Sequence, residues 1–149
     1  MTIFLIAVMV IVVFLQVIFR FIIKNSLAWS EEMARYLLIW VTFLGASIGI
    51  KRKSHIGVEF VVHLLPDKIQ TCVRIIANTL AMAFFMAVIT WGQKLLIIVS
   101  KQRSPAMEIS MAIPYGGILV SSVLMIIYLL YNILLDLSEM GKVRKKEIQ

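Results

Sequence analysis

The residues most able to do chemistry are two adjacent glutamates, Glu31 and Glu32, with Arg35 following them. They stand between two strongly apolar runs, and the second run leads into Gly45-Ala46-Ser47-Ile48-Gly49. Acidic side chains at the entrance of a membrane helix are costly unless something outside the helix needs them. The group could therefore serve a substrate site, form ion pairs or bind a partner protein.

A second candidate site lies farther along the chain, where His55, Glu59 and His63 recur every four residues. Histidine and glutamate are common metal ligands. Two histidines eight residues apart, however, cannot both reach one ion from a straight helix. We therefore interpret the stripe as the solvated face of a short amphipathic helix, residues 55–65, that lies in the membrane interface.

Neither catalysis nor independent transport is indicated by the remaining polar residues. Catalysis needs a nucleophile, a base and an orienting group that converge, and the sequence offers no such cluster. Cys72 is the single cysteine, which excludes an intrachain disulfide and a multi-cysteine metal site. A self-contained transporter would need an ionisable group at mid-membrane. Gln16 in the first run and Asn78 in the run 75–93 are polar, but neither can take up or release a proton at physiological pH.

The composition is that of an integral membrane protein, because 61% of the 149 residues are hydrophobic and the mean hydropathy is +0.96. Soluble domains are roughly 45–50% apolar. Three uncharged runs are long enough to span a bilayer: 1–19, 75–93 and 109–135. The run 36–50 reaches about 30 Å only if its helix starts near Glu31. Ser30 is the N-cap that we expect for that start.

We therefore predict an all-α protein, an integral membrane four-helix bundle in one membrane domain over residues 1–149. The expected spans are 2–23, 31–50, 68–99 and 109–136, and the interfacial helix 55–65 joins the second span to the third. The first run lacks a basic segment before it and a small-residue cleavage pattern after it, so we expect it to be retained. Pro114 predicts a kink or a late start in the fourth span.

Basic residues account for a net charge of +7 and cluster beside the apolar runs rather than on a soluble surface. This placement follows the positive-inside rule, so we expect both termini in the cytoplasm and no binding to nucleic acid. Anionic lipid headgroups would attract the same residues. The candidate lipid-interface residues are Lys51, Arg52, Lys53, His55, Glu59 and His63.

Glu31 and Glu32 could form two kinds of ion pair. Arg35 can pair with Glu31 or Glu32 within the helix, which is worth about 0.2–0.5 kcal/mol on an exposed surface. Arg20, at the end of the first run, can instead bridge to either glutamate across the hairpin 21–29. The two arrangements are compatible, and the second would serve an inter-helix or inter-subunit contact.

Small and aromatic residues indicate helix packing. Gly45 and Gly49 form a G-x-x-x-G pair, for which packing inside the bundle is the commoner cause and a neighbouring subunit the alternative. Trp29 fits an interfacial aromatic belt, whereas Trp40 falls near the middle of its helix and is expected to fill a protein contact. The candidate structural or partner-interface residues are therefore Arg20, Trp29, Glu31, Glu32, Arg35, Trp40, Gly45 and Gly49.

The order and spacing of these residues are similar to those of a known family. The residues on which the similarity rests are Gln16, Arg20, Trp29, Glu31, Glu32, Arg35, Trp40, Gly45-Ala46, Lys51-Arg52-Lys53, His55-Ile56, Leu65-Pro66, Ser104-Pro105 and Pro114. With them the chain resembles, over nearly its whole length, the small membrane subunit of a tripartite ATP-independent periplasmic (TRAP) transporter. It departs from the family in having Glu59 where aspartate is frequent and in lacking a proline in the first hairpin.

The resemblance implies a division of labour among three proteins. A soluble periplasmic protein captures an organic anion, and a large membrane subunit moves it inward with the sodium gradient. The small subunit is then a scaffold without a cofactor, and a role in docking the binding protein is open. Sodium is expected to bind the large subunit. Family substrates include dicarboxylates, keto acids and sialic acid, and nothing in this chain chooses among them.

Our leading hypothesis is thus a non-catalytic scaffold subunit in the inner membrane of a bacterium, with a large polytopic subunit, a periplasmic binding protein and lipids as partners. The alternative from a different class is an autonomous small transporter that works as a homo-oligomer. Such a protein would be expected to carry a mid-membrane Glu or Asp. A membrane enzyme is the third possibility, but no cluster of residues in the sequence indicates one.

Overall fold

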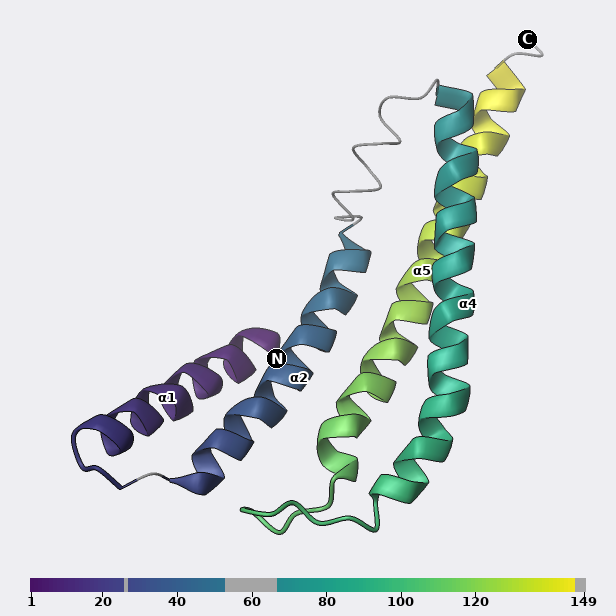
Figure 1. The fold of residues 1–149 in the computed structure, drawn as a ribbon. Helices are drawn as coiled ribbons and strands as arrows, with labels where there is room; N and C mark the ends of the chain where they lie inside the picture. The colour runs from purple at the N-terminus through teal and green to yellow at the C-terminus, as the bar shows by residue number, and fades with distance from the viewer. Residues whose placement is uncertain (26, 53–66, 147–149) are drawn as a thin grey trace. The chain divides into compact units, whose positions relative to one another are not determined.

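The computed structural model describes residues 1–25, 27–52 and 67–146, and their regular structure is helical (Figure 1). The helices are α1 (Thr2–Phe21), α2 (Ala28–Lys51), α4 (Asp67–Val99) and α5 (Ala112–Lys146). Each of these four contains a stretch long and apolar enough to cross a membrane. The all-α architecture and the four apolar helices agree with the prediction. The expected interfacial helix 55–65 lies outside the described residues.

The first helix is apolar on every side. Thr2–Phe21 has no acidic residue in its first turn, and none of its residues is buried. Arg20 lies in the last turn, where a cation interacts favourably with the negative end of the helix dipole. A helix with this composition is suited to contact lipid or other membrane helices around its circumference.

The second helix begins differently from the sequence-based expectation. It starts at Ala28, so Ser30 lies inside the first turn. The Ser30 hydroxyl donates a hydrogen bond of 2.8 Å to the carbonyl oxygen of Leu27, rather than accepting one as an N-cap would. The predicted capping role of Ser30 was therefore wrong. The earlier start makes α2 24 residues long, which places Glu31 and Glu32 in its first two turns.

The fourth apolar helix begins at Ala112, with Pro114 in its first turn. A proline is tolerated there because the first-turn N–H groups have no intrahelical acceptor. The residues before it form a compact connection in which the Ser104 N–H donates to the Ile109 carbonyl at 2.9 Å. Arg103 and Ser110 form an antiparallel bridge in the same connection.

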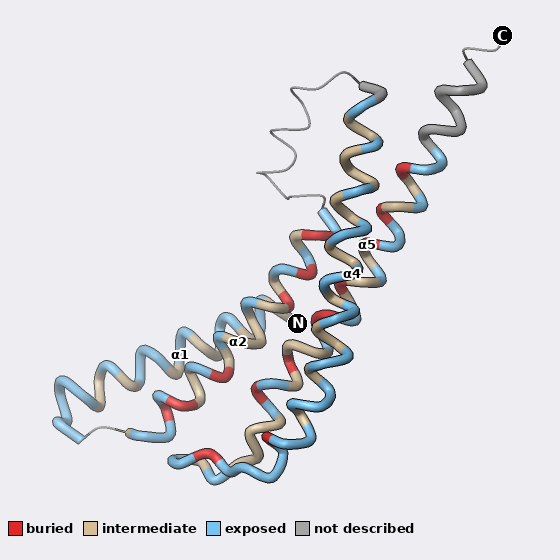
Figure 2. The backbone as a smooth tube through the Cα atoms, turned by 45° about the vertical axis from the view of Figure 1, so that its right-hand side comes forward, coloured by how far each residue is buried: buried red, intermediate tan, exposed pale blue. Residues whose placement is uncertain are grey.

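Contacts within the chain group into two compact units. The first combines Met1–Gly45 with Thr90–Ser121, and the second combines Ala46–Ile89 with the chain from Ser122 onward. Buried positions recur along one side of α5 in steps of three or four residues (Figure 2), as expected for one helical face. In the first unit they are Pro114, Gly117 and Ser121, and in the second Ser122, Met125, Leu129, Asn132 and Asp136.

The chain buries polar residues and exposes large apolar ones. Ser121, Ser122 and Asp136 are fully buried, whereas Leu80, Phe84 and Trp91 on α4 are more than 60% exposed. In a membrane protein this pattern is expected, because lipid covers apolar side chains and small or polar residues allow helices to approach.

Candidate functional site

Glu32 is the centre of the best-connected polar cluster in the first unit. Its side chain is only 8% exposed. One carboxylate oxygen accepts a hydrogen bond of 2.6 Å from the Tyr36 hydroxyl. The other accepts hydrogen bonds from the backbone N–H groups of Ala106, at 3.1 Å, and Met107, at 2.9 Å. We call these four residues the Glu32 cluster; it ties the start of α2 to the connection between α4 and α5.

Local structure explains how the cluster forms. Tyr36 follows Glu32 by four residues on α2, so their side chains lie on the same face. The connection turns at Glu108, whose φ of 53° is in the left-handed region. The Arg103 guanidinium donates to the carbonyl oxygen of that residue at 3.0 Å. The successive N–H groups of Ala106 and Met107 then point at one acceptor, which is the arrangement of a backbone anion site.

The chemistry available to Glu32 is that of an internal anion. Three hydrogen bonds come from neutral donors, and together they occupy both carboxylate oxygens. Such bonds to a charged group are stronger than those between neutral groups. The carboxylate therefore fixes the α4 to α5 connection against α2, and its oxygens are directed into the chain rather than toward a ligand.

Trp40 joins α2 to α5 in this unit. Its indole N–H donates to the carbonyl oxygen of Ile113 at 3.2 Å. A Cβ atom at Gly117 would lie 2.8 Å from the indole ring of Trp40. The glycine thus lets the backbone of α5 approach the ring, and Trp40 occupies a protein contact at mid-helix.

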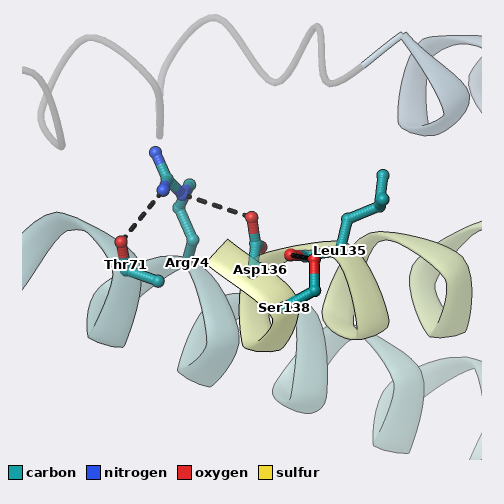
Figure 3. Close-up of polar contacts among 5 residues, drawn as sticks. All are labelled: Thr71, Arg74, Leu135, Asp136 and Ser138. Carbon is teal, nitrogen blue, oxygen red and sulfur yellow. Dashed lines mark hydrogen bonds and ion pairs between the residues drawn. The ribbon is translucent and has the colours of Figure 1, made fainter. Parts of the chain in front are cut away.

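In the second unit, α5 carries two buried polar residues that reach other helices. The Asn132 side-chain amide donates to the carbonyl oxygen of Ile50 on α2 at 3.1 Å. Asp136 is 0% exposed, and its Oδ1 lies 3.6 Å from the Nε of Arg74 on α4 (Figure 3). The Arg74 guanidinium also donates to the Thr71 hydroxyl at 3.1 Å.

Sequence analysis missed the contacts of Arg74, Asn132 and Asp136. A signal was present: Asp136 directly follows the uncharged run 109–135, and Arg74 directly precedes the run 75–93. Charges at the ends of two apolar runs at the same side of a bundle can meet. Charged residues are usual at the ends of spans, so the sequence alone does not distinguish Arg74 and Asp136 from other flanking charges.

The predicted ion pairs of the acidic entrance are not formed within the part of the chain that the structure describes. Arg20, Glu31 and Arg35 are exposed, and Glu32 is directed to the α4 to α5 connection instead of to either arginine. The pairing of Arg20 or Arg35 with Glu32 was therefore wrong. The physical reason is that two backbone N–H groups and a hydroxyl already satisfy this carboxylate. Trp29 is 43% exposed.

The two glycines of the G-x-x-x-G pair have room around them. A Cβ atom at Gly45 or Gly49 would meet nothing within 4 Å. Packing inside the described chain therefore does not require these glycines.

Of the candidate lipid-interface residues, Lys51 and Arg52 are exposed. The Lys51 Nζ lies 5.6 Å from the centroid of the Tyr128 ring, a cation–π contact. Lys53, His55, Glu59 and His63 lie outside the described residues. Within the described ranges, no group of three or more His, Cys, Asp or Glu is placed to hold a metal ion.

Comparison of the sequence with known proteins assigns the chain to a family. Residues 9–139 match the model of the DctQ component of the tripartite ATP-independent periplasmic transporters. The chain belongs to this family. As a small TRAP permease subunit with four apolar helices, it is a multi-pass protein of the inner membrane.

Individual relatives agree with the assignment. The chain is 33% identical over 108 residues to the isethionate TRAP transporter permease protein DctMQ of Oleidesulfovibrio alaskensis, which is 70% of this chain and 17% of that protein. It is 29% identical over 76 residues to the C4-dicarboxylate TRAP small permease protein DctQ of Vibrio cholerae, covering 51% of this chain and 33% of that one. A Haemophilus influenzae protein of the TRAP small permease type is 24% identical over 132 residues, 89% of this chain and 80% of the relative.

The matches thus span a third or less of the first two relatives and most of the third. These relatives are transporter permease proteins, so the TRAP family places the chain among transport subunits rather than enzymes.

Proposed function

We propose that this TRAP subunit is a non-catalytic scaffold of a sodium-coupled importer of organic anions. It would act with a large membrane subunit, which binds the sodium and moves the substrate, and with a periplasmic substrate-binding protein. The observation that carries the proposal is the Glu32 cluster. The acidic residue that most resembled a substrate site is engaged by Tyr36 and two backbone N–H groups of its own chain.

Exposed apolar surface supports a role in holding a larger membrane protein. None of the residues of α1 is buried, and Ile76, Leu80 and Phe84 on α4 are each more than half exposed. The open positions at Gly45 and Gly49 support close approach by a helix of the large subunit, because a glycine pair permits backbone contact. Lipid would cover the remaining apolar faces.

The substrate class proposed here is an organic anion of the dicarboxylate, keto acid or sialic acid kind. The relatives are named for isethionate, C4-dicarboxylates and sialic acid, which are all organic anions. The described residues of this chain offer no group that would choose among them. Selection is therefore assigned to the binding protein and the large subunit.

The proposed orientation places both termini in the cytoplasm. Lys51 and Arg52, at the end of α2, are exposed and would face anionic lipid headgroups on that side. A reporter that works only in the cytoplasm should be active when it is fused after Gln149. Activity only of a reporter that requires the periplasm would overturn the orientation.

Reconstitution tests the scaffold role. Liposomes containing the large subunit with this chain should import substrate when the binding protein and a sodium gradient are supplied, and liposomes with the large subunit alone should import it far more slowly. Import at the full rate by the large subunit alone would contradict the proposal. Import by this chain alone would instead establish the autonomous transporter.

A further inference from the structure

Asn132 and Asp136 lie four residues apart on the buried face of α5, in the second unit. They are 5% and 0% exposed. Residues with this spacing share one face of a helix, one turn apart. Burying an amide and a carboxylate in a membrane protein is unfavourable unless both find partners. Each of these side chains contacts a different helix.

The first contact is specific for the end of α2. Asn132 donates to the carbonyl oxygen of Ile50, the penultimate residue of the helix Ala28–Lys51. A carbonyl in the last turn has no N–H group four residues later within the helix. Carbonyls in the middle of α2 already accept hydrogen bonds within the helix, so the carbonyl of Ile50 is a better acceptor for the Asn132 amide than those are.

The second contact is specific for the beginning of α4. Arg74 lies two turns into the helix Asp67–Val99, and its Nε is 3.6 Å from Asp136 Oδ1. Thr71, one turn earlier, accepts a hydrogen bond from the same guanidinium at 3.1 Å and so holds the arginine in place (Figure 3). The Arg74 side chain is 32% exposed and that of Asp136 is 1% exposed, so the carboxylate is the buried partner.

We propose that Asn132 and Asp136 form a polar clamp on α5 that sets the distance between the end of α2 and the start of α4. The chain connects these two ends through residues 53–66. The clamp ties each end separately to one turn of α5 and so fixes their spacing. This role goes beyond the scaffold function proposed above and does not depend on it.

A clamp of this kind makes a distinct prediction from simple burial of satisfied polar groups. If the contacts only add stability, removing either one should loosen the whole unit. If they are two separate ties, removing Asp136 should release α4 while α2 stays in place, and removing Asn132 should do the reverse.

The natural single cysteine permits a direct measurement. Cys72 is exposed on α4, and Leu137 on α5 is 51% exposed. Spin labels at Cys72 and L137C report the distance from α4 to α5 in the full-length chain in nanodiscs. Ile48 on α2 is 38% exposed, so labels at I48C and L137C, with Cys72→Ser, report the distance from α2 to α5.

Pulsed electron paramagnetic resonance should show that each substitution changes one of the two distances and not the other. D136N should shift or broaden the distance distribution from α4 to α5 and leave that from α2 to α5 unchanged. N132L should do the opposite. R74Q, at a side chain that is 32% exposed, should reproduce D136N and keeps the test valid if D136N fails to fold. S138A is the matched control, because the Ser138 hydroxyl is exposed and donates only within α5, to Leu135 at 2.8 Å.

Two results would overturn the clamp. Unchanged distributions in D136N, R74Q and N132L would show that the two contacts do not set the spacing. Broadening of both distances by either single substitution would show one cooperative core instead of two separate ties.

Discussion

Glu32 and Asp136, two buried carboxylates among the residues that the structure describes, have different kinds of partner. Glu32, at the start of α2, is held by a hydroxyl and two backbone N–H groups, all of them neutral donors. Asp136, near the end of the apolar part of α5, faces the guanidinium of Arg74. The first carboxylate shapes a connection between helices, and the second joins two helices through charge. Both are used inside the chain, as the proposed scaffold role requires of its ionisable groups.

Removing the Glu32 side chain should have the largest effect. E32A takes away the acceptor of the Ala106 and Met107 N–H groups and of the Tyr36 hydroxyl at once. We expect a fall of several degrees in the melting temperature of the detergent-solubilised chain, together with faster proteolysis in the α4 to α5 connection. E31A is the matched control, since Glu31 is adjacent and exposed. An equal loss in both variants would contradict the role assigned to the Glu32 cluster.

Replacing each carboxylate by an amide of the same length should show a different loss of stability at the two sites. In D136N the ion pair between Asp136 and Arg74 is lost, which we expect to cost about 1–3 kcal/mol, less than for a fully buried pair because the Arg74 side chain is 32% exposed. In E32Q the amide oxygen can still accept from the backbone and the Tyr36 hydroxyl can accept from the amide. Unfolding free energies should therefore fall more in D136N than in E32Q, and the reverse order would refute the distinction between charged and neutral partners.

The apolar contact between α2 and α5 can be tested beside these polar ones. G117A places a methyl group 2.8 Å from the Trp40 ring, and overpacking of this kind costs about 1–3 kcal/mol. G116A is the control, because a Cβ there meets nothing within 4 Å. Thermal unfolding should distinguish the two variants. Equal stability would mean that Trp40 can move away without cost.

Loss of one donor to Glu32 should give the smallest effect. Y36F removes the 2.6 Å hydrogen bond from the Tyr36 hydroxyl to Glu32, together with the weaker 3.3 Å contact of that hydroxyl to the Met111 sulfur, and leaves both backbone donors in place. We expect a loss of about 1.5 kcal/mol in unfolding free energy, the lower end for a hydrogen bond to a charged group, because both backbone donors remain. A loss as large as that of E32A would show that the hydroxyl, and not the pair of N–H groups, dominates the cluster.

The sequence predicted the helices better than their contacts. The spans are visible because long uncharged runs are required by the bilayer, and helical structure satisfies their backbone. Glu32 was identified as important because its charge is unusual in that place. Its partners were not, because they are backbone N–H groups 74 and 75 residues away whose position depends on how the α4 to α5 connection folds. The side chains of Ala106 and Met107 do not indicate that their backbone N–H groups bind a carboxylate.

Trp40 and Asp136 show the same limit. The mid-helix position of Trp40 predicted a protein contact, but the partner had to be a place where α5 lacks a side chain, which only the fold locates at Gly117. Asp136 was overlooked because it stands at the end of an apolar run, where charges are usual. Its burial follows from the face of α5 on which it falls.

Transport by assembled complexes that carry E32Q or D136N tests the central claim most directly. The variant subunits would be purified with the large subunit, reconstituted in liposomes and assayed for sodium-dependent import with the binding protein. If both carboxylates only hold the scaffold together, the yield of complex should fall while the import rate for each assembled complex stays at the level of the unaltered transporter. Assembly at full yield with import abolished would contradict the account, because the carboxylate would then take part in transport itself.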